Sequence, residues 1–109
     1  MLWINLVREE QLQEIKDKSN QKPQVIFKYS SRCSLSGVAK NRLDKSTPPA
    51  GMDFYFLDLI KHRDISNKVS QEFSVYHESP QVIIIKNGES IYDESHTAIN
   101  MQEIEAHAA

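Results

Sequence analysis

The sequence predicts an α/β fold in which helices cover both faces of a central mixed sheet. Strand-like apolar runs alternate with amphipathic helical segments along the 109 residues, a pattern typical of strands joined by crossover helices. Asn87-Gly88 is a two-residue hairpin signal after the last strong strand, so the final strand pair should be antiparallel. The expected order is β-α-β-α-β-α-β-β-α, in a single domain over residues 1–109.

The first half of the chain should contain two strands and two helices. Residues 3–6 are short and apolar, as an edge strand would be, and residues 7–18 form a helix with acids first and lysines last. Residues 24–29 are β-branched and aromatic on both faces, which is typical of a central buried strand. A second helix is expected over residues 34–45. Its spacing puts these residues on one face: Leu35, Val38, Ala39, Arg42 and Leu43.

Residues 47–51 hold the main cluster of proline and glycine and predict a loop within the domain. Residues 53–59 read as another buried strand. Ile65, Val69 and Phe73 then recur at four-residue steps, which predicts a third helix.

Residues 81–85 are the third strong strand, and residues 89–93 return from the hairpin. Asn100 followed by Glu103 resembles a capping box, so the last helix should start there and run to about His107.

Composition limits the classes of partner. A formal charge of −2 gives no electrostatic argument for binding nucleic acid or an anionic membrane. No apolar run reaches the roughly 18–20 residues that span a bilayer, and the N-terminus lacks the pattern of a secretory signal. A single cysteine cannot form an internal disulfide, which fits a reducing compartment. We therefore expect a cytoplasmic protein, and no feature requires more than a monomer.

Cys33 is the only cysteine, and it stands where the strand of residues 24–29 should lead into a helix. The free N–H groups of a helix N-terminus favour a thiolate, and this end of an α/β sheet is the usual ligand crevice. Arg32 either adds positive charge or faces water. Most lone cysteines are buried small apolar residues, but the polar neighbours of Cys33 favour a reactive thiol.

Two serines follow the thiol closely. Ser36 either donates its hydroxyl to the Cys33 sulfur or faces solvent as an ordinary serine of an early helical turn. Ser34 either caps the helix or supplies a donor to the sulfur, and capping is the stronger interpretation. Further along, Ser79-Pro80 immediately precedes a strong strand, a position that suits proline because it lacks an N–H for the ladder.

The element order, a Cys-x-x-Ser at the second helix and a Ser-Pro before the fourth strand resemble the thioredoxin-like fold, a three-layer sandwich. The resemblance implies that Pro80 is cis and faces Cys33, with Ser79 offering backbone groups to a thiol substrate. Classical thioredoxins have a buried aspartate where this chain has Phe27, and dithiol relatives have a resolving cysteine where it has Ser36. These two differences argue against a dithiol reductase.

Four blocks narrow the resemblance to the monothiol bacilliredoxin family: Cys33-Ser34-Leu35-Ser36, Arg63-Asp64-Ile65-Ser66-Asn67, His77-Glu78-Ser79-Pro80-Gln81 and Ser95-His96. That family usually has Thr-Cys-Pro-Ile-Ser at its active site, whereas Arg32 and Ser34 occupy the first and third places here. Unlike proline, Ser34 has an N–H that could bind the sulfur or the small thiol.

The resemblance implies a one-thiol exchange. Cys33 attacks a mixed disulfide between a client protein and bacillithiol or a similar small thiol, with binding contributions from Arg32, Ser34, Ser36, Ser79 and Pro80. Bacillithiol would be a transient covalent co-substrate, and no cofactor or metal is expected. His62, His77, His96 and His107 show no ligand spacing with Cys33.

Two other functions stay open from the sequence. One is a non-catalytic binding module that uses the groove beside Pro80. The other is an iron–sulfur carrier like the monothiol glutaredoxins, although their Cys-Gly-Phe-Ser motif is absent.

Overall fold

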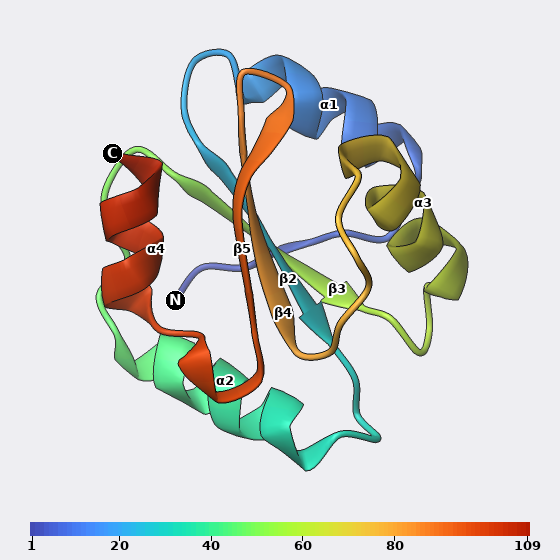
Figure 1. Ribbon diagram of the computed structural model, residues 1–109, viewed down its shortest axis with the longest axis vertical. Coiled ribbons are helices and arrows are strands. Elements are labelled where there is room, and N and C mark those ends of the chain that lie inside the picture. Colours follow the sequence, from blue (N-terminus) through green and yellow to red (C-terminus); the bar gives the residue numbers. More distant parts are fainter.

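A computed structural model describes residues 1–109 and confirms the predicted element order (Figure 1). The sheet has five strands in the order β1-β3-β2-β4-β5. The first three are parallel, whereas β4 is antiparallel to β2 and β5 is antiparallel to β4. The strands are β1 (Ile4–Asn5), β2 (Gln24–Tyr29), β3 (Asp53–Asp58), β4 (Gln81–Lys86) and β5 (Glu89–Ser95). The helices are α1 (Glu10–Lys18), α2 (Ser34–Lys45), α3 (Arg63–Phe73) and α4 (Met101–Ala108), with a 3-10 turn at His96–Ala98.

Helices cover both faces of the sheet, as predicted. Figure 1 shows α1 and α3 on one side of the strands and α2 and α4 on the other. Successive side chains of a strand point to opposite faces of the sheet. Each pair of helices therefore packs against a separate cluster of apolar side chains on its own face. Ile26 packs in the cluster that contains α1 and α3 residues, and Phe27 packs in the cluster that contains α2 and α4 residues.

The hairpin between β4 and β5 forms where Asn87-Gly88 predicts it. Both residues have positive φ, 54° for Asn87 and 77° for Gly88, as a two-residue turn of this kind needs. The return strand is longer than predicted and reaches Ser95.

Two local predictions need correction. The first helix begins at Glu10 and not near Val7, since the N–H groups of Val7 and Arg8 bond instead to the side-chain oxygen of Gln11. The capping box at α4 is half formed. Asn100 accepts from the N–H of Glu103 at 2.9 Å, but the Glu103 carboxylate turns toward His107, 3.4 Å away.

The buried face of α2 also differs from the prediction. Its buried residues are Ser36, Ala39 and Leu43, while Leu35 and Val38 are 38% and 52% exposed. The helix is rotated so that a serine, and not the neighbouring leucine, points to the sheet. No helix is both long enough and apolar enough to cross a membrane.

Candidate functional site

Cys33 occupies the N-cap position of α2, directly after the turn that ends β2, and is partly buried. Its N–H donates to the carbonyl of Ser30 at 3.1 Å, and its carbonyl accepts from the N–H of Ser36 at 3.0 Å. These bonds fix the turn. The sulfur therefore sits at the positive end of the helix dipole, where a negative charge is favoured.

The thiol faces the residues that the sequence predicts. The Ser79–Pro80 peptide bond is cis, as expected, and Pro80 is buried. The sulfur of Cys33 lies 3.8 Å from the carbonyl oxygen of Ser79, within reach of a weak S–H···O hydrogen bond. Two segments 46 residues apart in the chain thus meet at one point.

The three other predicted binding residues lie around the thiol in different ways. Arg32 is exposed, and its backbone N–H donates to the hydroxyl of Ser30 at 3.2 Å. Ser34 is exposed and is the first helical residue, so the prediction that it caps α2 is wrong; Cys33 holds that position without a side-chain cap bond. The roles of Arg32 and Ser34 in binding stay predictions.

Ser36 fits neither sequence interpretation. Its side chain is fully buried, so it does not face solvent, and its oxygen accepts from the backbone N–H of Ser30 at 3.1 Å. Its hydrogen bond therefore supports the turn that carries Cys33 rather than the sulfur itself.

Substituting Ser36 by alanine should lower the free energy of unfolding by about 1–3 kcal/mol, because the buried N–H of Ser30 loses its acceptor. Urea denaturation followed by circular dichroism measures the change. A matched substitution, Ser34→Ala, removes an exposed hydroxyl from the same helical turn and should change stability by less than about 0.5 kcal/mol. Equal losses in the two variants would contradict the assigned role of Ser36.

An aromatic cluster takes the place of the thioredoxin aspartate. Phe27 is fully buried, and the Trp3 ring stacks on it with 5.6 Å between centroids. Phe56 lies 6.2 Å from Phe27 and Tyr29 lies 5.1 Å from Phe56. Position 27 thus offers no carboxylate for a proton relay.

The sequence analysis missed Lys28, which is fully buried. Its ammonium nitrogen donates to the carbonyl of Ser66 and the hydroxyl of Ser70, both at 3.1 Å, and lies 3.3 Å from Nδ1 of His77. Burial, and secondarily the nearby Arg63 charge, lower the pKa of Lys28 from 10.5 to about 8. A lysine that follows the apolar run of residues 25–27 within a predicted buried strand was the signal that could have found it.

As long as Lys28 is protonated, its ammonium has donors only, so the His77 ring that faces it accepts at Nδ1 and, when neutral, carries its proton on Nε2. Burial lowers the pKa of His77, the charges of Lys28 and Arg63 lower it further, and Glu78 opposes them.

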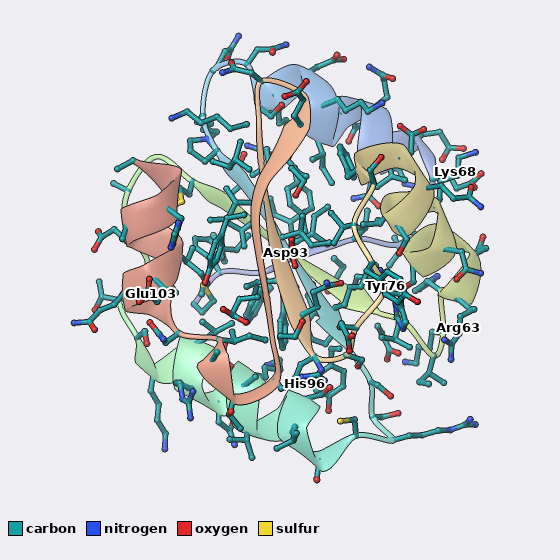
Figure 2. The ribbon with its side chains drawn as sticks, viewed as in Figure 1. Arg63, Lys68, Tyr76, Asp93, His96 and Glu103 are labelled. Carbon is teal, nitrogen blue, oxygen red and sulfur yellow. The ribbon has the colours of Figure 1, made fainter.

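His96 borders the same site from the other side. Its N–H donates to the carbonyl of Pro80 at 3.0 Å, and its Nε2 lies 3.5 Å from the Glu78 carboxylate. It also has a left-handed backbone, with φ of 59°. Figure 2 shows Tyr76 on the segment between α3 and β4, and His96 where β5 ends.

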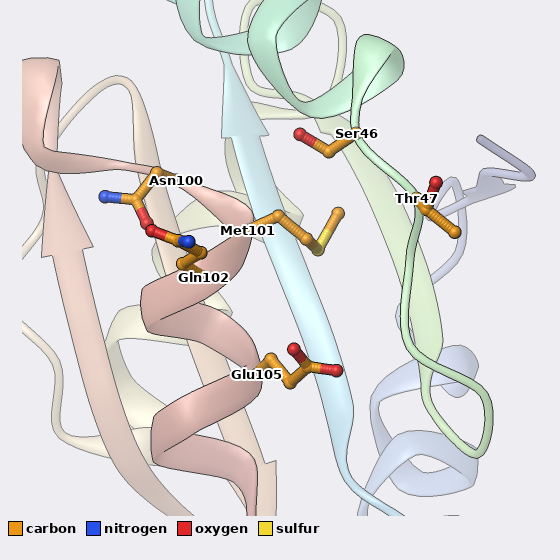
Figure 3. A pocket seen from close by; sticks show the side chains of 6 residues that line it. All are labelled: Ser46, Thr47, Asn100, Met101, Gln102 and Glu105. Carbon is orange, nitrogen blue, oxygen red and sulfur yellow. The ribbon is translucent and has the colours of Figure 1, made fainter.

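A surface depression of about 370 Å³ lies away from the thiol, between the start of α4 and the segment after α2 (Figure 3). Ser46 and Thr47 line it from one side and Asn100, Met101, Gln102 and Glu105 from the other. Ser46 follows the last residue of α2, whereas Cys33 precedes the first. At about 1.5 Å per residue the helix separates the two by most of its length, so this depression is not part of the thiol site.

The fold and the site together define a class, a thioredoxin fold with one cysteine opposite a cis-proline. A solved protein described as having a thioredoxin fold is 27% identical, with a TM-score of 0.82 over 97% of this chain and 93% of that one. The thioredoxin of Malassezia sympodialis (18% identity, TM-score 0.74, 99% and 92% covered) and the oxidised thioredoxin of Plasmodium falciparum (16%, 0.74, 99% and 100%) share the fold.

The family assignment is more specific. The profile of the monothiol bacilliredoxin BrxC matches residues 4–104, nearly the whole chain. The chain belongs to the monothiol bacilliredoxin family, and family and fold together support a redox role in thiol–disulfide chemistry.

Proposed function

We propose that this protein removes bacillithiol, or a similar low-molecular-weight thiol, from S-thiolated client proteins through Cys33. The carrying observation is a single thiol placed 3.8 Å from the Ser79 carbonyl, beside a cis-proline and with no second cysteine in the chain. Such a thiol cannot resolve its own mixed disulfide, so the second sulfur must come from another molecule.

The exchange takes two steps. The Cys33 thiolate attacks the small-thiol sulfur of the mixed disulfide; a new S–S bond forms, the bond to the client breaks, and the client leaves as a thiolate that takes up a proton. A second molecule of the small thiol, as thiolate, then attacks that small-thiol sulfur and releases Cys33. In the net reaction the client sulfur is reduced to a thiol and the one free small thiol is oxidised, because the small-thiol sulfur of the mixed disulfide stays at the disulfide level throughout and ends in the symmetrical disulfide.

The backbone beside Cys33 supplies the docking edge. An incoming chain that runs along Ser79 would meet its backbone groups while its disulfide lies against the sulfur. Arg32 and Ser34 are exposed beside Cys33 and would contact the small thiol. Ser36 stabilises the same turn by accepting a hydrogen bond from the N–H of Ser30. Holding the reacting sulfurs at contact distance in line is the main gain available to such a site.

The test is mass spectrometry of the purified protein after treatment with bacillithiol disulfide. We expect one adduct, located at Cys33, that free bacillithiol clears within minutes to hours. Parallel treatment with glutathione disulfide identifies the preferred small thiol. A thiol that stays unmodified would contradict the proposal and favour a binding module.

We place this activity in the reducing cytoplasm, with the protein acting as a monomer, because nothing in the proposed exchange needs a second copy.

A further inference from the structure

The cis-proline segment, residues 75–80, is held to the sheet by two buried polar side chains. The side-chain nitrogen of Gln81 donates to the carbonyl of Tyr76 at 2.9 Å, and Lys28 lies 3.3 Å from Nδ1 of His77. Lys28 and Gln81 are register partners on β2 and β4, and both are at most 1% exposed. The segment is therefore bound to the sheet at two adjacent residues, Tyr76 and His77.

The Lys28 ammonium has an acceptor for each of its three N–H groups, and none of them is a carboxylate. Two acceptors belong to α3, the Ser66 carbonyl and the Ser70 hydroxyl, and the third is His77. A fully buried lysine without an acidic partner is a costly way to fill a strand position, since an apolar side chain would fit the neighbouring cluster. What the lysine contributes is a directed bond from the centre of the sheet to the cis-proline segment.

The contact between Lys28 and His77 joins the two chain segments that form the thiol site, the one that carries Cys33 and the one that carries Ser79. Going one way along the chain, β2 ends at Tyr29 and the turn after it carries Cys33. Going the other way, His77 stands two residues before Ser79, whose carbonyl faces the sulfur at 3.8 Å. The same strand thus fixes the position of the thiol and, through Lys28, that of the surface opposite it.

We infer that Lys28 and His77 form a latch that sets the position of the Ser79 backbone relative to Cys33, which makes them positioning residues for disulfide exchange. The inference rests on the proposed function for its kinetic consequence. Its structural consequence, the placement of the cis-proline segment, stands independently of the substrate.

The test compares two reactions of Cys33 in a set of variants. Alkylation by iodoacetamide needs only the thiol, whereas exchange with an S-bacillithiolated protein also needs the Ser79 surface. In Lys28→Met and His77→Leu, exchange should slow by about tenfold or more while alkylation stays within about twofold. Exchange that stays at the wild-type rate in both variants would overturn the latch, as would an equal loss in the two reactions.

Two matched variants separate the latch from general effects of substitution. His77→Asn keeps an acceptor, Oδ1, bonded to Cγ as Nδ1 is in histidine, and should restore most of the exchange rate lost in His77→Leu. Lys22→Met makes the same chemical change before β2, at the end of the strand away from Cys33, and should leave exchange unchanged. The double variant Lys28→Met/His77→Leu should be no slower than the slower single variant, because each single variant already lacks the bond between Lys28 and His77. Additive losses would overturn the pairing.

Nuclear magnetic resonance keeps the inference testable if the wild type performs no exchange, an outcome that refutes the proposed function alone. The backbone amide shift of Ser79, which is not adjacent to either substituted residue, should move in Lys28→Met and His77→Leu and move less in His77→Asn. Unmoved shifts in the first two variants would overturn the latch. Since the His77 side chain is on the surface, His77→Leu decides the question if Lys28→Met fails to fold.

Discussion

Replacing Cys33 by serine should stop release of the small thiol from an S-thiolated client, slowing it by about two orders of magnitude or more. The attacking species is a thiolate, and a serine hydroxyl is almost never ionised near neutral pH. No other cysteine in the chain can take its place. The measurement is the rate at which a purified S-thiolated protein loses the adduct mass in the presence of free small thiol.

A neighbouring substitution controls for damage to the turn. Ser31 is exposed two residues before Cys33, so Ser31→Ala should leave the release rate within about twofold of wild type. Release by Cys33→Ser at the wild-type rate would show that the chemistry belongs to another group or to the free thiol alone, and the exchange proposal would fail.

The element order could be read from the sequence because it depends on local periodicity. Residues 24–29 and 81–85 are mostly apolar on both faces and form the interior strands β2 and β4, and Asn87-Gly88 has the conformational freedom that its turn requires. The meeting of Cys33 with Pro80 is different. Neither residue's neighbours indicate it, and only the family resemblance placed them together.

The contacts that support the site depend on tertiary packing that no local pattern contains. Strand alternation could assign Lys28 to one face of the sheet, but its acceptors lie 38, 42 and 49 residues further along the chain. The burial of Ser36 follows from the rotation of α2 about its axis. The apolar residues Leu35 and Val38 predicted a rotation that would bury them. In the structure both are exposed, and the smaller Ser36 side chain is buried against the sheet.

The largest pH effect on stability should come from Lys28. Its pKa is about 8 in the folded protein, against an ordinary 10.5. Between these values the unfolded chain holds a proton that the folded protein has released, so the free energy of unfolding rises with pH across this window. Below about pH 8 both states are protonated, and the full cost of burying the charge is present.

Removing the amine should remove this pH dependence. Relative to Lys28→Met, the wild type should gain on the order of 2 kcal/mol in free energy of unfolding from pH 8 to 10.5. That figure is below the full conversion of the shift, because solvent reaches the exposed His77 end of the latch and screens part of the effect. Urea denaturation at a series of pH values measures the difference.

Comparing two proteins cancels the titrations they share. Burial, and then Asp53 and Glu14, raise the pKa of Tyr55 to about 12, so stability falls above about pH 10 in both wild type and variant. His77 affects stability at acidic pH. Its lowered pKa means that the unfolded chain takes up a proton first below about pH 6.5, which destabilises the fold there.

Lys28→Met also relieves His77 of the nearest cation, so the acid loss of stability should be smaller in the variant than in the wild type. Lys22→Met supplies the matched control, because this lysine is at the surface with a 46% exposed side chain, and its stability should run parallel to wild type between pH 8 and 10.5. A wild-type difference from Lys28→Met that stays flat over the same range would mean that Lys28 is not a buried cation. Lys28 would then hold its proton over the same pH range in the folded and the unfolded state, as a lysine at the surface does.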